Sequence, residues 1–489
     1  MNRRDLLKLT ASLPLISTAS AQTAKPAFRR SRPGDPSWPT DARWQELKRQ
    51  VGGQLVRVRS PLEACTTAPG SAACASVFKG LKNPYYIRDD VALTQTSGWA
   101  DAWTSTASPW AVAARNAADV AAAVDFARQH RLRLVVKGGG HSYQGTSNAP
   151  DSLLVWTRSL DSIVPHEAFA GRGCTTPPQP AISLGAGTIW RDAYAAAAKA
   201  GRYVQGGGCL TVGVAGLIQS GGFGSFSKRF GLAAAGLLEA EVVTADGKVS
   251  VANACTNADL FWGLKGGGGG SLGVVTRLTL RTHDLPNFLG GVFLTVKAGS
   301  DAAYRRLIQR FMSFYRESLF NPTWGESVRF RADNTLEISM VFQGLDQAAA
   351  AAVWKPLFDW VAASPGDFAF ATPPMIVAVP ARNFWDAAFL KQNAPGVVLS
   401  DDRPDAPADN VFWRGNLGEA GWFLHAYQSA WMPAVLLAPE REAELADALF
   451  ASSRHWTQSL HFNKGLAGAP PAEVAAARDT ATNPAAVEA

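Results

Sequence analysis

The chain has 489 residues, of which 47% are hydrophobic and 18% are charged. This composition is typical of a globular protein with a large core, and it excludes a disordered chain. The formal charge of +7 is a mild excess without a block of Lys or Arg, so nucleic acid is not indicated as a partner. A chain of this length is predicted to form two or three domains.

The N-terminus reads as an export signal. Arg3 and Arg4 form a twin-arginine pattern, a short apolar region runs to Ile16, and residues 19–21 (Ala-Ser-Ala) suit a cleavage site. We therefore expect residues 1–21 to be a twin-arginine signal peptide and the mature protein to be periplasmic or secreted. The alternative is a basic tail before a helix. The apolar region is too short to span a membrane, and no later stretch qualifies.

Residues 22–45 are rich in Pro and Arg and read as a leader, and residues 46–105 read as a loop-rich first part of the next domain. Periodicity then predicts a helix over residues 117–130 and a strand over 131–136. Further predicted elements are strands 153–156 and 181–184, helix 190–200, a hairpin of 240–243 with 248–251, and strand 274–280. Because helices and strands mix without a βαβ period, the fold class is predicted to be α+β.

The character of the chain changes at about residue 286. Strand-like runs at residues 291–296, 327–330, 336–342 and 423–428 are separated by long helical stretches. We therefore expect one domain over residues 106–285, a second domain over 286–455, and a C-terminal segment over 456–489. Residues 472–489 read as an alanine-rich helix with no closing strand.

There are five cysteines. Cys65 and Cys74 flank a short loop, and a disulfide between them is expected in an exported chain. Cys174 and Cys255 could pair or remain free. No spacing of Cys or His indicates a metal site.

Two nucleophilic side chains stand in glycine-rich loops. His141 follows Gly138, Gly139 and Gly140, and Cys209 follows residues 206–208, which are also three glycines. Glycine lets a ligand approach the backbone closely, and stacked backbone N–H groups in such turns form anion-binding nests. The pattern predicts two ligand-binding loops, one with an imidazole and one with a thiol.

Three other interpretations of the glycine-rich stretches fit less well. A Rossmann loop needs a helix directly after the glycines, and residues 142–150 are a poor helix start. Residues 269–273 match the Gly-x-Ser-x-Gly nucleophile elbow, but the strand predicted from residue 274 stands where the elbow needs a helix. A flexible linker is a third reading of the five glycines at 266–270, and we favour a backbone surface against a cofactor.

Three ordered motifs resemble one family. They are residues 135–145 around His141, residues 208–224 around Cys209, and residues 260–275 around the five glycines. The chain resembles the berberine bridge enzyme-like branch of the vanillyl-alcohol oxidase superfamily, which has a PCMH-type FAD-binding domain. The cofactor-binding residues that the resemblance implies are His141, Cys209, Gly138, Gly139, Gly140, Ser142, Gly145, Gly208, Val212, Gly213, Gly216, Gly221, Gly222, Gly224, Gly273 and Val275.

The resemblance implies an α+β protein with a two-part FAD-binding domain and a substrate domain whose antiparallel sheet is backed by helices. It implies FAD attached through both His141 and Cys209, with oxidation of an alcohol, a sugar or a secondary metabolite and reduction of molecular oxygen to hydrogen peroxide. Flavin carries the redox chemistry in such enzymes. A dehydrogenase that uses another electron acceptor and a non-catalytic binding protein on the same scaffold are the alternatives.

Several details follow from the resemblance or depart from it. Val212, three residues after Cys209, stands where the family is proposed to gate oxygen. Tyr427 is the candidate catalytic base, because it would share a strand face with His425 on the run 423–428. Lys137, Leu217 and Ala235 replace residues that are more frequent in the family, and the closing C-terminal segment of the family is not recognisable.

Overall fold

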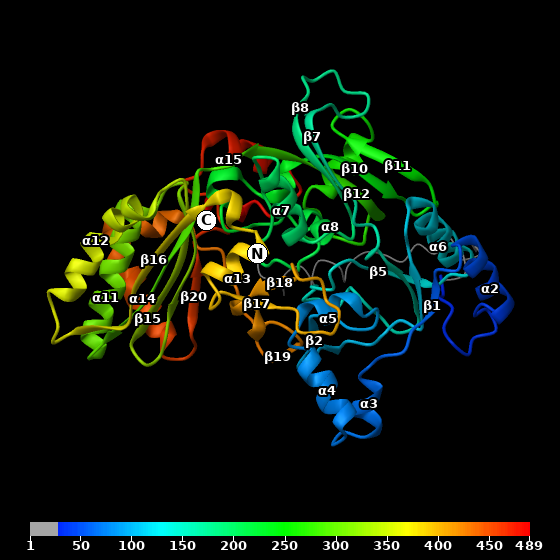
Figure 1. The fold of residues 1–489 in the computed structure, drawn as a ribbon, viewed down its shortest axis with the longest axis horizontal. Coiled ribbons are helices and arrows are strands. Elements are labelled where there is room, and N and C mark those ends of the chain that lie inside the picture. The colour runs from blue at the N-terminus through cyan, green and yellow to red at the C-terminus, as the bar shows by residue number, and fades with distance from the viewer. Residues whose placement is uncertain (1–27) are drawn as a thin grey trace, which may run out of the picture.

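The structure is a computed structural model, and it describes residues 28–489. Two bodies lie side by side (Figure 1), and we call them the N-terminal body (residues 28–285) and the C-terminal body (residues 286–380 and 425–462). Mixed helices and sheets build both of them, which confirms the predicted α+β class. The predicted signal peptide, residues 1–21, lies outside the described residues.

The first sheet of the N-terminal body holds the strand that leads to His141. Its order is β1 (Leu55–Arg57), β4 (Trp110–Ala113), β6 (Ser152–Trp156) and β5 (Arg133–Lys137), with β4, β6 and β5 parallel. Helix α6 (Ala117–Gln129) connects β4 to β5, and the Asn116 side chain caps its N-terminus by accepting from the Asp119 N–H. This helix and strand were predicted from the sequence.

The second sheet of this body is antiparallel and carries the strands on either side of the Cys209 region. Its order is β11 (Val249–Asn253), β10 (Leu237–Val243), β12 (Val274–Asp284), β8 (Gln179–Gly185) and β7 (Ile163–Phe169), with β9 (Arg202–Val204) also paired to β12. Around it lie α7 (Trp190–Lys199), α8 (Val214–Gln219), α9 (Ser227–Phe230) and α10 (Ala258–Leu264). The predicted hairpin is β10–β11. A disulfide joins Cys174 to Cys255, which settles the question that the sequence left open.

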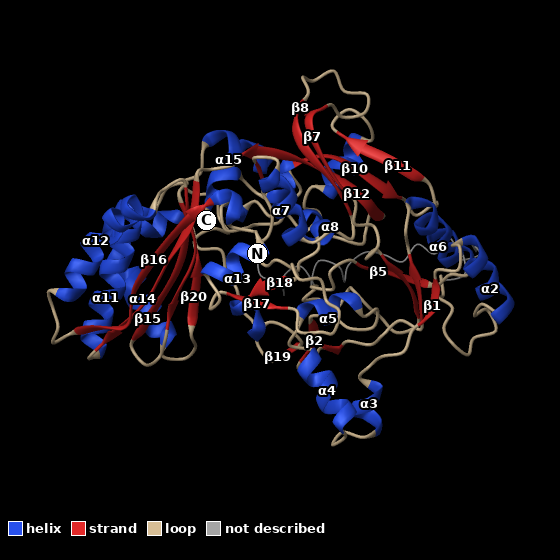
Figure 2. Ribbon diagram, viewed as in Figure 1, coloured by secondary structure: helices blue, strands red, loops and turns tan. Residues whose placement is uncertain are grey.

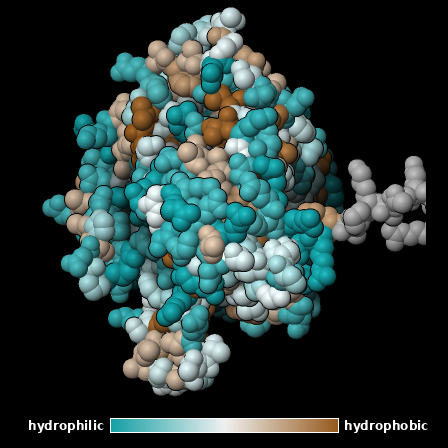
Figure 3. All heavy atoms as spheres, turned by 90° about the vertical axis from the view of Figure 1, so that its right-hand side faces the viewer, coloured by the Kyte–Doolittle hydropathy of each residue, from teal (hydrophilic) through white to brown (hydrophobic). Residues whose placement is uncertain are grey.

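The segment expected to be loop-rich, residues 46–105, contains regular structure, and so does the end of the expected leader. Together these two segments form α2 (Asp41–Gln50), α3 (Glu63–Thr67), α4 (Ala72–Gly80), α5 (Pro84–Asp89), β2 (Thr96–Trp99) and β3 (Trp103–Thr104). Trp44 and Leu47 of α2 are fully buried in the main core, so these short helices are stabilised by packing that local patterns do not reveal. The predicted disulfide between Cys65 and Cys74 is present and joins α3 to α4. Figure 3 shows this disulfide-linked pair as the knob at the bottom of the view.

The C-terminal body is an antiparallel sheet with helices on one face. Its order is β16 (Phe368–Pro380), β13 (Phe288–Ala298), β15 (Thr335–Gln343), β14 (Trp324–Phe330) and β20 (Gln458–His461). One face of the sheet is covered by α11 (Asp301–Phe314), α12 (Gln347–Ala362) and α14 (Glu442–Ser453) (Figure 2). An apolar core fills the space between these helices and the sheet. The sheet therefore extends past residue 455, where this domain was expected to end, because β20 pairs with β14.

Residues 381–424 leave the C-terminal body and pack on the N-terminal body, and we call them the return segment. They include α13 (Ala387–Asn393), β17 (Val398–Ser400), β18 (Val411–Trp413) and β19 (Trp422–Leu424). Trp385, Leu390 and Val411 are buried in the main core of the N-terminal body, and β19 pairs in parallel with β2. The predicted strand 423–428 is wrong beyond Leu424, because only residues 422–424 find a pairing partner.

The C-terminal segment, which we define from residue 463, also packs on the N-terminal body. It forms α15 (Pro471–Arg478) and α16 (Ala485–Glu488) in place of the single helix expected. Leu466, Ala477 and Val487 bury apolar surface with Leu232, and Glu473 pairs with Arg281 at 3.0 Å. No closing segment was recognisable in the sequence, but in the structure the C-terminal segment packs against the N-terminal body.

Candidate active site between the two bodies

The His141 loop follows β5 directly. A Cβ atom on Gly139 would lie 2.7 Å from the Gly213 nitrogen, so only glycine allows the two loops to touch backbone to backbone. The His141 Nε2 atom lies 3.1 Å from Thr211 Oγ1. Desolvation by the surrounding protein and the charge of Lys137 lower the pKa of His141 to about 4, so the imidazole is neutral near pH 7. A neutral imidazole has a free nucleophilic nitrogen.

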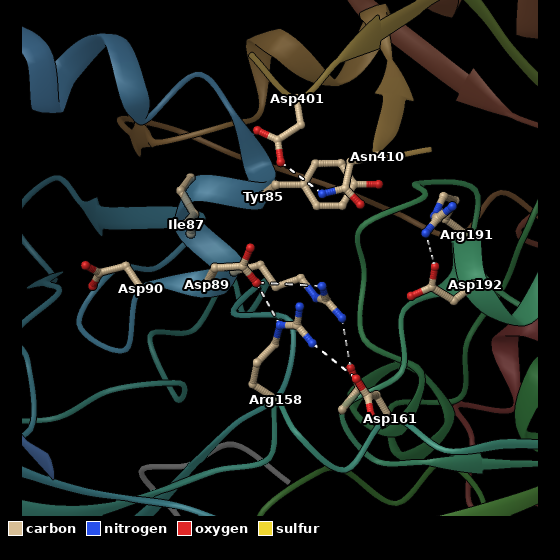
Figure 4. Close-up of polar contacts among 12 residues, drawn as sticks. Tyr85, Ile87, Asp89, Asp90, Arg158, Asp161, Arg191, Asp192, Asp401 and Asn410 are labelled. Carbon is tan, nitrogen blue, oxygen red and sulfur yellow. Dashed lines mark hydrogen bonds and ion pairs between the residues drawn. The ribbon is translucent and has the colours of Figure 1, made fainter. Parts of the chain in front are cut away.

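Lys137, the last residue of β5, holds the start of this loop in place. Its side chain is fully buried, and its ammonium donates to the carbonyls of Ile87 at 2.9 Å, Leu93 at 2.7 Å and Asp90. The lysine thus joins the end of β5 to the last turn of α5 and the segment after it; Figure 4 labels Ile87 and Asp90 there. Desolvation lowers the pKa of Lys137 to about 7, against the charges of Asp90 and Asp89, and the three carbonyls give its buried donors their partners.

The Cys209 loop joins β9 to α8 and is held from two sides. The Tyr194 hydroxyl donates to the Gly207 carbonyl at 2.6 Å, and the Trp413 indole N–H donates to the Gly208 carbonyl at 3.0 Å. Tyr194 belongs to the N-terminal body, whereas Trp413 belongs to the return segment. Cys209 is half-buried, and it is the one free cysteine among the described residues.

Polar groups from remote parts of the chain surround the Cys209 sulfur. The Asn416 amide donates to Sγ at 3.1 Å, and Sγ lies 3.9 Å from the Glu419 carboxylate. Desolvation, together with the negative charges of Glu419 and Glu326, raises the pKa of Cys209 to about 12. Burial also raises the pKa values of both carboxylates. The thiol is therefore held in its neutral form beside two carboxyl groups.

Glu326 marks the point where the two bodies meet. Its carboxylate accepts a hydrogen bond from Ser225, and its backbone has a positive φ of 67° within β14. The neighbouring Gly325 has no room for a side chain, because a Cβ atom there would lie 1.9 Å from the Ser225 carbonyl. Asn463 donates to the Gly224 carbonyl at 3.0 Å on the same side. Burial lowers the pKa of Lys464. The acidic groups Glu326, Glu419 and Cys209 raise it again in part.

Tyr427, the candidate base, lies in a loop after β19 and is 56% exposed. Its ring stacks on Tyr143 with the centroids 6.4 Å apart, and Tyr143 also contacts Trp422 at 5.8 Å. Desolvation, followed by the charge of Glu419, raises the pKa of Tyr143. The strand face that Tyr427 was expected to share with His425 does not form, since the strand ends at Leu424.

Several other residues that the sequence predicts for the site make contacts within the protein. Gly145 packs against the Trp103 ring, and Gly222 packs against Leu217. Gly273 allows β12 to approach the Val243 carbonyl, and Val275 is buried in the core of the same sheet. Ser142 closes a turn by bonding Thr146.

One stretch of backbone faces open space. Gly208, Gly216 and Ser220 are exposed, and a Cβ atom on Gly216 would meet no described atom within 4 Å. Gly221 stands beside Thr482. Asn416 Oδ1, Asn463 Oδ1 and Thr482 Oγ1 are among the buried polar atoms that find no hydrogen-bond partner within the described residues. Bare backbone next to unpaired polar atoms suits a large polar ligand.

An ionic cluster fixes the return segment that supplies Trp413, Asn416 and Glu419. The buried Asp401 carboxylate accepts from Asn83 at 2.8 Å, from Asn410 at 3.0 Å and from Arg403 at 2.7 Å. Arg403 also pairs with Asp89. Asp89 in turn pairs with Arg158 (Figure 4). The cluster joins the return segment to α5 and to the loop after β6.

Sequence reasoning missed Trp413, Asn416, Glu419, Glu326 and Lys464 as residues of this site. They are isolated polar or aromatic residues, far from either glycine loop along the chain, and no spacing pattern relates them to Cys209. Among the described residues, no helix is long and apolar enough to cross a membrane, and no group of three or more His, Cys, Asp or Glu side chains is arranged to bind a metal.

A family model described as "FAD binding domain" matches residues 109–253. The FAD-linked oxidoreductase penH of Penicillium thymicola is 30% identical over 423 residues, which are 81% of this chain and 69% of that protein. The FAD-linked oxidoreductase easE of Trichophyton verrucosum is 33% identical over 365 residues, which are 69% of this chain and 60% of that protein. The chain spans 54–61% of the length of three such relatives.

A solved structure gives the same picture. The VAO-type flavoprotein MtVAO615 of Myceliophthora thermophila aligns with a TM-score of 0.68 at 26% identity, over 87% of this chain and 75% of that one. MtVAO713 of the same organism aligns with a TM-score of 0.68 at 20% identity, which shows a shared fold.

Proposed function

Because this chain belongs to the FAD-linked oxidoreductases, we propose that it is an exported oxidase with FAD attached through both His141 and Cys209. Its substrate would be an alcohol, a sugar or a secondary metabolite, and molecular oxygen would be the electron acceptor. Bound FAD supplies an acceptor for a hydride at its N5 atom. The protein's residues bind and orient the reactants and move the proton.

The observation that carries this proposal is the pairing of two nucleophiles in adjoining loops. Thr211 contacts His141 and lies two residues from Cys209, so the imidazole and the thiol share one neighbourhood. One is a neutral imidazole, and the other is the free thiol of a chain whose other four cysteines form disulfides. The imidazole is already in its nucleophilic form, whereas the thiol must give up its proton when the bond forms, because the thiolate is the nucleophilic form of cysteine.

The residues present fit the cofactor. Gly208 and Gly216 are exposed, and the open space at Gly216 leaves room for a planar ring system. The unpaired oxygens of Asn416, Asn463 and Thr482 offer partners for its polar atoms. We propose that this strip, with the loops at residues 138–140 and 220–222, holds the FAD.

Removal of the substrate proton requires a base near the ring. We propose Tyr427, whose ring stacks on Tyr143. Tyr143 lies near enough to Glu419 for desolvation and then the Glu419 charge to raise its pKa. Glu326 is a second candidate, because burial raises the pKa of its carboxyl and makes it a stronger base. Tyr427→Phe should lower kcat at least tenfold with little change in the midpoint of thermal unfolding, and an unchanged kcat would transfer the role to Glu326.

Oxygen must reach the flavin in an oxidase. Val212 is half-buried beside Cys209, and its small side chain is compatible with access of oxygen. A peroxide assay with a panel of sugars and alcohols tests this. Flavin that is reduced by a substrate without forming peroxide would indicate a dehydrogenase, and flavin that no substrate reduces would indicate a binding protein.

The covalent attachment has its own test. Wild-type protein should remain yellow after acid precipitation, because covalent bonds survive denaturation. Loss of all flavin to the supernatant would show that the cofactor is held without covalent bonds.

Export by the twin-arginine route is the remaining part of the proposal. Two disulfides are compatible with an oxidising compartment. Replacing Arg3 and Arg4 by Lys should leave the precursor in the cytoplasm, as cell fractionation would show, whereas unchanged export would exclude a twin-arginine signal.

A further inference from the structure

We propose that Glu419 accepts the proton of the Cys209 thiol, and that Asn416 orients its sulfur, when the FAD is joined to this cysteine. The inference rests on the covalent attachment proposed above. It assigns the two residues a role in building the holoenzyme, before any substrate is turned over.

The sulfur atom sits between two different hydrogen-bonding groups. The Asn416 amide can only donate to it, at 3.1 Å, so a sulfur lone pair faces Asn416. The Glu419 carboxylate can only accept when ionised, and it lies 3.9 Å away, so the S–H bond is directed to Glu419. One contact fixes the lone pair and the other fixes the hydrogen. A further lone pair remains free for bond formation.

One short turn supplies both groups. Asn416 lies in the 3₁₀ turn η4 (Arg414–Gly418), Glu419 follows it directly, and the Glu419 N–H donates to the Asn416 carbonyl at 3.1 Å. Side chains three residues apart lie on the same side of such a turn. The spacing therefore delivers a donor and an acceptor to one atom.

Both ends of the turn are anchored. On one side, Trp413 donates to the Gly208 carbonyl, next to Cys209 itself. On the other side, Ala420 is fully buried, and its carbonyl accepts from Lys82 at 3.1 Å. The turn is thus fixed over the sulfur by contacts that do not involve Asn416 or Glu419.

The surroundings of Cys209 explain why a base is needed. The nucleophilic form of cysteine is the thiolate, but burial and two neighbouring carboxylates make a free thiolate rare here. If the proton passes to Glu419 while the new bond forms, the carboxylate becomes a neutral acid, the sulfur becomes a neutral thioether, and the one negative charge passes to the ring system that takes up the electron pair. No new charge is then buried, and the raised pKa of Glu419 makes it a better acceptor.

The reaction balances with oxygen as the oxidant. The S–H bond and one ring C–H bond break, and one S–C bond forms. The thiol proton goes to Glu419, the ring proton goes to solvent, and the electron pair of the C–H bond remains on the ring system. Molecular oxygen, the acceptor in the proposed function, removes these two electrons with two protons and yields hydrogen peroxide.

The chain offers a clean test, because Cys209 is its one free thiol and the other four cysteines are in disulfides. The full-length protein, isolated without flavin from riboflavin-limited cells, is alkylated with iodoacetamide over pH 5–10. In the wild type we expect a rate that becomes constant once Glu419 is ionised, because the reacting pair then keeps one shared proton. In Glu419→Gln the rate should instead rise about tenfold per pH unit, because only the free thiolate reacts.

Glu326→Gln is the matched control. It removes the same charge from the vicinity of Cys209 but no contact with the sulfur, so its profile should keep the constant region of the wild type. Asn416→Ala should lower the rate at all pH values without changing the shape of the profile. Glu419→Asp should restore part of the constant region. The same profile in Glu419→Gln and the wild type would overturn the proposal.

A second readout is the mass of the Cys209 peptide from protein made with FAD. In Glu419→Gln we expect at least a tenfold lower fraction of this peptide to carry FAD, while the His141 peptide is modified as in the wild type. A wild-type Cys209 peptide without FAD would overturn the attachment itself. A modified wild-type peptide that is equally modified in Glu419→Gln would overturn only the role of Glu419.

Discussion

The His141 loop and the Cys209 loop look alike in sequence but are held by different parts of the chain. His141 contacts Thr211, 70 residues away, and the buried Lys137 side chain lies against Gly140 of its loop and donates to the Leu93 carbonyl of the same body. The Cys209 sulfur receives a hydrogen bond from Asn416, 207 residues away, and lies beside Glu419 of the same return segment. The first loop is thus built by its own body, and the second is completed from outside it.

In both loops the reactive side chain and its surroundings come from different sources. The glycines set the backbone of both loops, and they are visible as a local pattern. The chemistry of the side chain depends on what surrounds it, and at Cys209 this comes from a segment that no local pattern connects to it. The predictions below test whether the two loops really are independent in this way, beginning with the largest expected effect.

The largest effect should come from removing both nucleophiles. His141→Ala and Cys209→Ala should each retain covalent FAD at the remaining residue, and the double variant should release all of it. Absorbance of the acid-precipitated pellet at the flavin bands measures this. If either single variant released all of its FAD, the two attachments would depend on each other and the comparison would fail.

Lys137→Met should destabilise the base of the His141 loop by about 3 kcal/mol, because three buried carbonyls lose their donor. Denaturant unfolding measures the loss. Lys228→Met is a matched control, since this buried lysine donates to one carbonyl, that of Ala467, and should cost less. Equal losses in both variants would show that the three carbonyls are not satisfied by Lys137.

Asp401→Asn should weaken the packing of the return segment and lower the attachment of FAD to Cys209, but not to His141. The Arg403, Asn410 and Asn83 hydrogen bonds outweigh desolvation and lower the pKa of Asp401 to about 2 from its ordinary 3.8. A lowered carboxyl pKa gives stability that is present above pH 4 and is lost as the pH falls towards 2, here about 2 kcal/mol.

Denaturant unfolding at pH 7 and at pH 2.5 measures this contribution of Asp401 to the free energy of unfolding. The difference between wild type and Asp401→Asn should be largest at pH 7 and small at pH 2.5. Attachment of FAD to Cys209 should fall in the variant while attachment to His141 does not. A parallel fall at both residues would show that the return segment supports both loops.

The smallest effects should come from the two hydrogen bonds that hold the Cys209 loop. Tyr194→Phe leaves the buried Gly207 carbonyl unpaired and should cost about 1 kcal/mol of unfolding free energy. Trp413→Phe removes a more exposed bond to Gly208 and should cost less than that. The reverse order in denaturant unfolding would show that the return segment holds this loop more strongly than its own body does.

Much of the fold could be predicted from the sequence. The helix now seen as α6, the strand β5 and the hairpin β10–β11 all have the periodicity or turn residues that local rules recognise. The helices between residues 41 and 89 are short and depend on buried contacts such as Trp44 in the core, so local rules read them as loop. The run 423–428 alternates like a strand, but residues beyond Leu424 have no partner strand, and pairing cannot be read from alternation alone.

The site divides in the same way. His141 and Cys209 could be named because glycines frame them and the order of motifs resembles a known family. Asn416, Glu419 and Glu326 could not, because their importance arises from tertiary contacts that join residues far apart in the chain. Tyr427 stays a prediction, with its neighbour Tyr143 now identified.

The burial of the return segment in the N-terminal body has a consequence for the order in which the protein assembles. Val411 lies in the same core as Val112, so this core is incomplete until about three hundred further residues have been made. At a synthesis rate of roughly 5–20 residues per second, the stretch from residue 286 to 411 keeps it open for roughly 6–25 s. The N-terminal body, although it is made first, therefore cannot complete this core until residues 286–380 of the C-terminal body have also been made. Its late closure leaves an interval in which a cofactor can enter before the return segment covers Cys209.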